Sequence, residues 1–268
     1  MSYQCPLCHQ SLTLTDRTYR CSNNHSFDLA KEGYVNLMPV QHKRSKDPGD
    51  NKEMMQARRR FLDHDYYARL RDRIAELCLE NTHQQTSTIL DIGCGEGYYT
   101  SHLAQETQST VFGLDISKAM IKQAAKRYSD VNFTVASSQR LPFSDNSLNA
   151  VVRIYAPCHH DELYRTIADN GIIITVTPAA QHLFQLRELI YEEVRLHHDE
   201  AESIVGFELE SEENLSYPMH LSGSDAYDLL QMTPFAWKAS PGLVADLKSR
   251  EAFVCDTDFS IRVYRKAR

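Results

Sequence analysis

A glycine-rich turn between a strand pattern and a helix pattern constrains the fold of this chain more than any other feature. Residues 90–97 read LDIGCGEG, and a helical pattern begins at Tyr98. Glycines permit a sharp turn and let a ligand approach the backbone closely. The spacing G-x-G-x-G departs from the G-x-G-x-x-G of dinucleotide sites, where a helix N-terminus faces a pyrophosphate. The turn therefore predicts a ligand site at the start of a helix.

Two acidic residues indicate the kind of ligand. Asp91 stands two residues before Gly93, the first glycine, and Asp115 ends the next strand pattern. A carboxylate beside the loop suits an ammonium group, such as that of S-adenosylmethionine, and a carboxylate at the second strand can accept hydrogen bonds from two ribose hydroxyls. We therefore interpret Asp91, Gly93, Gly95 and Asp115 as cofactor-binding residues. The alternatives are an NAD site and a purely structural turn, which the spacing and the two acids disfavour.

Strand and helix patterns alternate from residue 87 onward. Apolar runs predict strands at 88–92, 110–115, 132–136, 148–155 and 171–176. Helices are expected at 98–106, at 117–128 with Ser117 as the N-cap, at 161–168 and at 181–197. A final edge strand is expected at 258–264. This order predicts an α/β fold with a doubly wound parallel sheet.

A cluster of cysteines near the N-terminus predicts a zinc site. Cys5, Cys8, Cys21 and His25 have the spacing C-x2-C-x12-C-x3-H, whose two pairs can close a tetrahedron around the metal. Four protein ligands leave no open position, so the zinc is expected to be structural. His9 is an alternative to His25, disfavoured because it directly follows a ligand. Short alternating runs at 11–15 and 18–20 predict a hairpin in this region.

Charge is distributed unevenly along the chain. A net charge of −7 argues against a protein that coats nucleic acid over its whole surface. Basic residues nevertheless gather between residues 41 and 73, namely Lys43, Arg44, Lys46, Lys52, Arg58, Arg59, Arg60, Arg69, Arg71 and Arg73. They indicate either a contact with an anionic partner or a solvated helix face, because acidic residues alternate with them.

The chain contains no apolar run of about 18 residues, the length that a membrane helix requires. Its first residues, MSYQCPLCHQ, lack the apolar stretch of a signal peptide. A cytosolic protein without a membrane partner is therefore expected.

The acids and the glycine turn resemble class I methyltransferases, a Rossmann-like fold. In that family, Ser137 and Ser138 after the third strand match positions that contact adenine.

Small zinc modules on methyltransferases commonly recognise the large substrate. The expected organisation is a zinc-binding, RNA-recognition module at 1–34, a basic arm at 35–60 and a methyltransferase domain at 61–268. Two helices are expected between residues 53 and 79, separated near His64 and Asp65.

Several further segments resemble one family in particular. They are FDLAKEGYVNL at 27–37, QHKR at 41–44, DPGD at 47–50, EMMQARR at 53–59, RIYAPC at 153–158 and QMTPFAW at 231–237. Together with the zinc ligands, these segments resemble the bacterial 23S ribosomal RNA guanine-N1 methyltransferases, in the branch found in Gram-negative bacteria. The resemblance covers essentially the entire chain.

This resemblance implies methylation of guanine N1 in a hairpin loop of 23S rRNA, with a homodimer forming the RNA cleft. It matches Cys5, Cys8, Cys21 and His25 to zinc ligands. It matches Gly95, Glu96, Tyr67 and His182 to cofactor contacts, with Tyr66 as an alternative to Tyr67 because the preceding residues depart from the family pattern.

Removal of the guanine N1 proton requires a base, which the sequence does not identify. Asp161 and Glu162 follow the fourth strand, where class I enzymes present substrate residues, but they can equally cap the next helix. Tyr155 is expected either to stack on the flipped guanine or to lie at the edge of the core.

Other functions remain open. One is a methyltransferase for small molecules or other RNAs, in which the zinc module is only a staple. A second is a non-catalytic RNA-binding protein that senses S-adenosylmethionine. A zinc-finger DNA-binding protein is disfavoured because no recognition helix is evident after His25.

Overall fold

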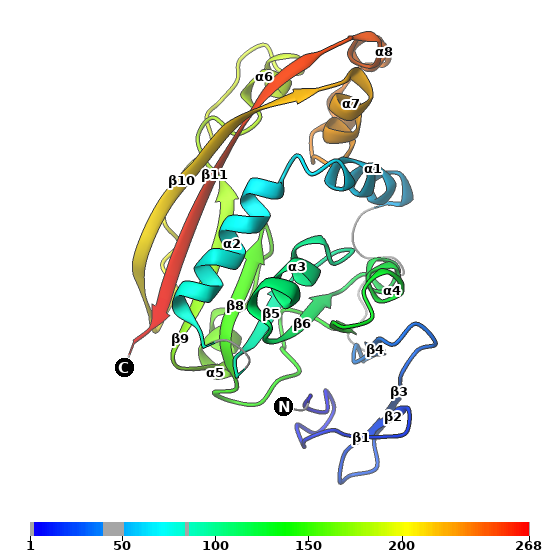
Figure 1. Ribbon diagram of the computed structural model, residues 1–268, viewed down its shortest axis with the longest axis vertical. Coiled ribbons are helices and arrows are strands. Elements are labelled where there is room, and N and C mark those ends of the chain that lie inside the picture. The colour runs from blue at the N-terminus through cyan, green and yellow to red at the C-terminus, as the bar shows by residue number, and fades with distance from the viewer. Residues whose placement is uncertain (1–2, 40–50, 84–85, 268) are drawn as a thin grey trace.

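The computed structural model describes residues 3–39, 51–83 and 86–267. One mixed sheet of eight strands forms its centre (Figure 1), comprising β4 (Val35–Asn36), β5 (Thr88–Ile92), β6 (Thr110–Asp115), β7 (Asn132–Val135), β8 (Leu148–Ile154), β9 (Ile167–Pro178), β10 (Phe207–Leu221) and β11 (Phe253–Lys266). Their order across the sheet is β10-β11-β9-β8-β5-β6-β7-β4. The strands from β9 to β4 run parallel, while β10 and β11 pair antiparallel at one edge. The expected α/β fold is confirmed.

Helices connect and cover these strands. They are α1 (Lys52–Asp63), α2 (Ala68–Asn81), α3 (Tyr98–Thr107), α4 (Lys118–Arg127), α5 (His160–Thr166), α6 (Phe184–Glu188), α7 (Gly223–Gln231), the short 3-10 helix η2 (Ala236–Lys238) and α8 (Pro241–Ser249). Ser117 caps α4 as expected, because its hydroxyl accepts a hydrogen bond from Met120 N at 3.4 Å. The expected break between the first two helices is also present, at Asp65 with its positive φ of 58°. None of the helices in the described ranges is long and apolar enough to span a bilayer.

The N-terminal module contains a small sheet of β1 (Thr13–Thr15), β2 (Thr18–Arg20) and β3 (Ser26–Asp28). The expected hairpin is therefore present, with a third strand added. The following segment pairs as β4 with β7, so the sequence expected to begin the basic arm contributes a short strand to the large sheet. Residues 26–39 contain no helix.

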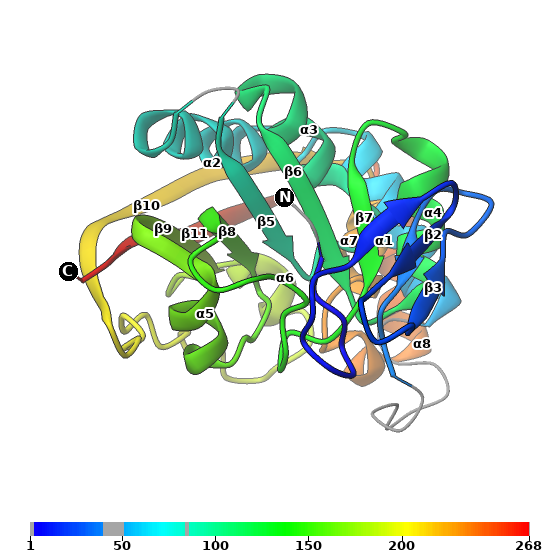
Figure 2. The ribbon, with the colours of Figure 1, turned by 90° about the horizontal axis from the view of Figure 1, so that it is seen from below.

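Alternate residues of the central strands contact two separate hydrophobic clusters. Ile89 is buried with residues of α2, α3 and α7 on one face of the sheet. Leu90 belongs to the other cluster, which includes Phe143 together with Tyr3 and Leu12 of the N-terminal module. The rings of Tyr3 and Phe143 have centroids 5.5 Å apart. The module therefore covers part of the second face and shares its core (Figure 2).

The prediction of a final edge strand at 258–264 is wrong. β11 is longer, and it pairs with β9 on one side and β10 on the other. The edge strand is β10, whose sequence FELESEENLSYPMHL is rich in acids and contains Pro218. Edge strands accept charges and proline because one side of their backbone stays unpaired. Because of this composition, the sequence does not predict β10 as a strand.

The long helix predicted at 181–197 is also wrong. α6 covers only Phe184–Glu188, and residues 194–204 form no regular secondary structure. Arg187 explains the difference. Its side chain is buried, and its guanidinium donates to the carbonyl oxygens of Arg195 at 2.8 Å and Ala180 at 3.3 Å. These bonds hold the chain folded back on itself, where the helical periodicity predicts a continuous helix.

Candidate active site and zinc centre

A cavity of about 610 Å³ opens at the carboxyl ends of β5, β6, β8 and β9. Parallel sheets in α/β proteins bind ligands at this edge. The volume lies within the range of about 300–1,000 Å³ that small-molecule sites occupy. The predicted cofactor residues that line it are Tyr67, Asp91, Gly93, Gly95, Glu96, Asp115 and His182.

The glycine loop leaves room for a ligand beside its backbone. Gly93 has φ of 74°, and a Cβ atom there would lie 2.8 Å from the Cβ of Ala156, so the turn requires glycine. Gly95 has φ of 55°, and no atom lies within 4 Å of where its Cβ would be. The Asp115 carboxylate holds this loop, since it accepts hydrogen bonds from Gly95 N at 3.0 Å and Ser117 N at 2.7 Å. Backbone and carboxylate thus form one open wall of the cavity.

Asp91 supplies a buried carboxyl group to the same wall. It is 2% exposed, and its Oδ2 accepts a hydrogen bond from Thr100 Oγ1 at 2.6 Å. Burial raises the pKa of Asp91 to about 7, against the effect of the Thr100 bond, and the charge of Asp115 raises it further. No Lys, Arg or His in the described ranges forms an ion pair with it. A bound ammonium group would supply the missing cation, which fits the methionine end of S-adenosylmethionine.

Asp91→Asn is expected to stabilise the cofactor-free protein as the pH rises. The folded state holds the Asp91 proton more tightly than the unfolded chain, where the carboxyl titrates near 3.8. The stability due to this proton is therefore full below about pH 4 and is lost as the pH rises through about 7. Asparagine has no such proton to lose and keeps an acceptor for Thr100.

Thermal unfolding of both proteins from about pH 5 to about pH 8 measures this effect. The melting temperature of the variant should rise relative to the parent across that range. Asp130→Asn provides the control, because it removes the same kind of carboxyl group from an exposed position. A constant difference between Asp91→Asn and the parent would contradict the assignment.

Glu96 and Tyr67, which the family resemblance matches to cofactor contacts, both line the cavity. Glu96 lines the cavity, but its carboxylate is held by Arg59 of α1 through two hydrogen bonds of 2.5 and 2.6 Å. Tyr67 is buried and lines the cavity, whereas the Tyr66 hydroxyl donates to Asp225 at 2.8 Å and Tyr66 is not among the described lining residues. Of the two tyrosines, Tyr67 is the one placed to contact a ligand.

Tyr155 and His182 meet on the wall formed by β8 and β9. The Tyr155 hydroxyl lies 3.3 Å from His182 Nε2, and both residues line the cavity. Tyr155 has a positive φ of 54°, a conformation that costs an aromatic residue on the order of 1–3 kcal/mol. Its backbone N–H donates to Val176 O at 3.1 Å, which fixes the turn. The structure therefore holds a strained tyrosine at the cavity, and 48% of the residue's surface is exposed.

The four predicted zinc ligands converge in the N-terminal module. Their ligand atoms all lie within 4.8 Å of one another. The His25 Nδ1 atom is 3.5 Å from Cys5 Sγ, 3.4 Å from Cys8 Sγ and 3.5 Å from Cys21 Sγ, and the Cys8 and Cys21 sulfurs are 3.6 Å apart. Zn–S bonds of about 2.3 Å and Zn–N bonds of about 2.0 Å require separations of about 3.5 to 3.8 Å around a tetrahedron. The site fits a structural zinc ion.

The alternative ligand His9 lies outside this cluster. Its ring contacts the guanidinium of Arg140 instead. His25 is therefore the fourth ligand that the geometry supports.

Comparison with known proteins also finds a zinc-binding module followed by a methyltransferase domain. Residues 3–46 match the zinc-ribbon family described as "RlmA, N-terminal", and residues 89–171 match the family "Methyltransferase domain". YxjB of Bacillus subtilis (strain 168), which carries a provisional name as a 23S rRNA (guanine-N(1)-)-methyltransferase, is 30% identical over 98% of this chain and 97% of its own length. The 23S rRNA (guanine(748)-N(1))-methyltransferase of Streptomyces fradiae is 30% identical over 90% of this chain and 88% of its own. The chain belongs to the 23S rRNA (guanine-N1)-methyltransferase family.

Solved structures share the fold of this methyltransferase at low identity. A provisionally named sarcosine dimethylglycine methyltransferase from Galdieria sulphuraria has a TM-score of 0.51 and 14% identity, and the match covers 76% of this chain and 88% of that one. This likeness concerns the fold alone. The class I methyltransferase fold is therefore confirmed. The match of residues 89–171 to the methyltransferase family also confirms the S-adenosylmethionine cofactor predicted from the glycine turn.

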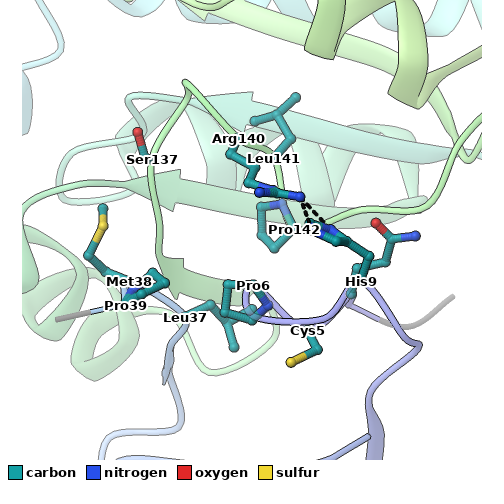
Figure 3. Close-up of a pocket in the computed structure, with 11 residues that line it drawn as sticks. Cys5, Pro6, His9, Leu37, Met38, Pro39, Ser137, Arg140, Leu141 and Pro142 are labelled. Carbon is teal, nitrogen blue, oxygen red and sulfur yellow. Dashed lines mark hydrogen bonds between the residues drawn. The ribbon is translucent and has the colours of Figure 1, made fainter. Parts of the chain in front are cut away.

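The two serines predicted to contact adenine in this methyltransferase do not line the large cavity among the described residues. Ser137 lines a separate pocket of about 40 Å³ between the zinc module and the catalytic domain (Figure 3). The backbone carbonyl of Ser138 accepts a hydrogen bond from Cys158 Sγ at 3.2 Å. Both serines nevertheless follow directly after Ala136, whose backbone N–H donates to the carbonyl oxygen of Asp115 at 3.1 Å, so their contact with adenine stays a prediction.

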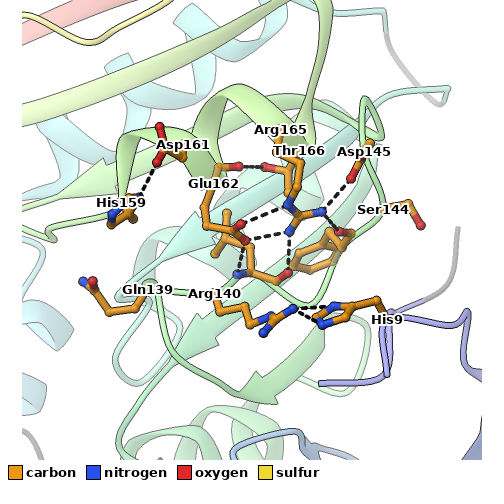
Figure 4. A network of polar contacts seen from close by, with 12 residues as sticks. His9, Gln139, Arg140, Ser144, Asp145, His159, Asp161, Glu162, Arg165 and Thr166 are labelled. Carbon is orange, nitrogen blue, oxygen red and sulfur yellow. Dashed lines mark hydrogen bonds and ion pairs between the residues drawn. The ribbon is translucent and has the colours of Figure 1, made fainter. Parts of the chain in front are cut away.

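The two acidic candidates for the base lie in the first turn of α5 (Figure 4). The Glu162 carboxylate accepts hydrogen bonds from Leu141 N at 2.8 Å and Arg165 Nη2 at 2.6 Å. Burial acts to raise the pKa of Glu162, but the bonds from Arg165 and Leu141 lower it overall, which makes a poor base. Asp161 is exposed, 3.6 Å from His159 Nδ1. Neither acid is among the described residues that line the cavity.

Several of the basic residues between positions 41 and 73 form ion pairs with acidic residues of the same chain. Arg60 donates to Asp228 at 2.5 Å, and Arg73 donates to Glu213 at 2.6 Å. Together with the Arg59 pair, these contacts favour the interpretation of α1 and α2 as helices with paired charges. Three of the basic residues that indicate an anionic partner, Lys43, Arg44 and Lys46, lie outside the described residues.

Several cavity residues have no counterpart among the predicted site residues. Arg58 and Arg59 reach it from α1, His197 from the segment after α6, and residues 232–235 from the segment after α7. Residues 232–235 belong to the QMTPFAW segment, which resembles the family. That resemblance points to the segment but does not predict that it lines the cavity. The expected helix at 181–197 conceals His197, because a helix would carry it away from the turn at His182.

Proposed function

We propose that this protein transfers a methyl group from S-adenosylmethionine to N1 of one guanine in a hairpin loop of 23S rRNA. One cavity contains both the predicted cofactor residues and the side chains placed to contact a guanine. The glycine loop, Asp91 and Asp115 face it from β5 and β6, and Tyr155 and His182 face it from β8 and β9. Membership of the rRNA methyltransferase family and the zinc ribbon on the same chain support RNA as the substrate.

The bound cofactor supplies a methyl group already activated by its sulfonium. The protein then has to orient the guanine, exclude water and favour loss of the N1 proton. Negative charge shifts to guanine O6 when that proton leaves. A hydrogen-bond donor aimed at O6 therefore stabilises the reacting form of the base.

Tyr155 can provide this donor because His182 is held in one tautomer. The backbone N–H of Asp258 donates to His182 Nδ1 at 3.2 Å, so Nδ1 is an acceptor. Burial lowers the pKa of His182 to about 3, which keeps the ring neutral, with its proton on Nε2. That N–H donates to the Tyr155 oxygen, and the Tyr155 hydroxyl proton is left to donate into the cavity.

Tyr155→Phe is expected to lower kcat by about 10- to 100-fold, the cost of a hydrogen bond to a charged group. The Kd for S-adenosylmethionine should stay unchanged, since the ring remains in place. The pH at which kcat reaches half its maximum should rise, because the deprotonated guanine loses its donor. Tyr164→Phe on α5 is the control, an exposed tyrosine that lines neither cavity described here. Unchanged kcat and pH profile in Tyr155→Phe would refute this role.

Transfer of labelled methyl groups to 23S rRNA and to a pool of small metabolites tests the substrate class. Incorporation into rRNA that falls as salt rises is expected, since RNA binding depends on phosphate contacts. Transfer to metabolites only, indifferent to salt, would favour the small-molecule enzyme. Cofactor binding without transfer to either would indicate a sensor.

We also propose that the protein acts in the cytosol as a homodimer whose two copies form the RNA cleft. The family resemblance of the segments at 27–59 and 231–237 supports this arrangement.

A further inference from the structure

The chain's single tryptophan lies two residues beyond a segment that lines the catalytic cavity. α7 ends at Gln231, residues 232–235 line the cavity, and η2 follows directly with Trp237 at its centre. Trp237 is the chain's one tryptophan and is 79% exposed. Tryptophan is enriched at binding interfaces, because its indole combines a large apolar surface with an N–H donor.

The surroundings of Trp237 combine aromatic rings with a positive charge. Lys238 Nζ lies 5.3 Å from the centre of the Trp237 ring and 4.6 Å from that of Tyr191. The Tyr191 ring lies 6.4 Å from that of Phe235, which lines the cavity. A row of aromatic side chains therefore runs from the cavity to the surface, with one ammonium group between the outer two rings. Exposed aromatic rings interleaved with cations are how proteins bind unpaired nucleotides.

We infer that Trp237 stacks on a nucleobase adjacent to the target guanine. This inference rests on the proposed function. A guanine that enters the cavity leaves its stack, so its neighbour loses a stacking partner near the cavity mouth. The indole face replaces that partner, and Lys238 offsets the phosphate charge that comes with it. Stacking reads no base identity, so Trp237 contributes affinity for an unpaired loop rather than choice of sequence.

The fluorescence of Trp237 tests this contact, because no other tryptophan contributes to the signal. The probe is a hairpin fragment of 23S rRNA that the wild-type protein binds, and the control RNA is a duplex of equal length without a loop. We expect the hairpin to change the emission with a midpoint equal to its Kd, and the duplex to leave it unchanged at the same occupancy.

Trp237→Ala should weaken hairpin binding roughly 5- to 150-fold, the range measured when a stacking aromatic is removed. The Kd for S-adenosylmethionine and the dependence of RNA binding on salt should not change, because neither the cofactor site nor a phosphate contact is altered. Trp237→Phe should restore most of the affinity, since a phenyl ring also stacks. Val205→Ala is the matched control, an apolar side chain 72% exposed elsewhere on the surface.

Three results would overturn the inference. One is normal RNA affinity in Trp237→Ala. A second is unchanged emission at saturating hairpin while the wild type methylates that RNA. A third is an emission change with protein concentration in the absence of RNA, which would assign Trp237 to a contact between two copies of the chain. Hairpin binding with the expected emission change but no methyl transfer would instead contradict the proposed function and leave the stacking contact standing.

Discussion

Asp115→Ala is expected to weaken S-adenosylmethionine binding by at least about 100-fold, because hydrogen bonds to a charged group contribute about 1.5–3 kcal/mol each and more than one is lost. The carboxylate ends β6 and accepts hydrogen bonds from the backbone of Gly95 and Ser117. Its removal takes away the acceptor proposed for the ribose hydroxyls and releases the glycine loop. Isothermal titration calorimetry with the cofactor measures the change.

Two comparisons separate this effect from general damage. Asp130→Ala removes an exposed acid beyond the C-terminal end of α4 and should leave the cofactor Kd unchanged. Asp115→Ala without cofactor should still unfold cooperatively, but at a lower temperature than the parent protein, because two hydrogen bonds to the glycine loop and its flank are lost. Cooperative unfolding shows that the variant is folded when its cofactor Kd is measured. An unchanged cofactor Kd in Asp115→Ala would contradict the assignment of this wall of the cavity.

His25→Ala is expected to lose the zinc ion and, with it, the fold of the N-terminal module. Structural zinc in such small units contributes on the order of 10–16 kcal/mol of binding free energy, which is also their folding free energy. The module then exposes residues such as Tyr3 and Leu12 that complete the second face of the sheet. Loss of zinc should therefore also lower the melting temperature of the catalytic domain. Elemental analysis for zinc, limited proteolysis and calorimetry report the three effects.

His9→Ala provides the matched control, because His9 is the neighbouring histidine and contacts Arg140 rather than the cysteines. It should retain one zinc ion per chain. Zinc retained in His25→Ala and lost in His9→Ala would reverse the ligand assignment. An unchanged melting temperature in zinc-free protein would show that the module and the sheet do not share a core.

The sequence predicts the parts of this fold that have a local cause. Ser117 caps α4 through its own side chain, and the turn at Gly93 requires the absence of a Cβ atom. Cys5, Cys8, Cys21 and His25 are read from spacing alone, because two close pairs are enough to build a tetrahedral site. Each of these features depends on residues near one another in the chain.

The errors arise where distant contacts override a local pattern. The buried guanidinium of Arg187 binds carbonyl groups of a returning segment, and no periodicity reveals that bond. β10 is stabilised by pairing with β11 along its length, although its own sequence carries acids and a proline. Such elements form because a neighbouring strand offers them a partner.

The candidate site divides in the same way. The acids of the cofactor wall follow from the ends of two strands, but the pairing of Tyr155 with His182 depends on the register of β8 and β9. The position of Trp237 depends on how α7 reaches the cavity from the far end of the chain. These placements depend on how the whole sheet is assembled, so the spacing of residues along the chain does not predict them.

Mapping the methylated nucleotide tests the central proposal most directly. The purified protein would be incubated with labelled S-adenosylmethionine and with 23S rRNA from cells that lack the gene, and the product would be analysed by mass spectrometry. A single N1-methylguanosine within one hairpin loop is the predicted result. No transfer to the rRNA while cofactor binding is intact, or a methyl group on another atom or another base, would contradict it.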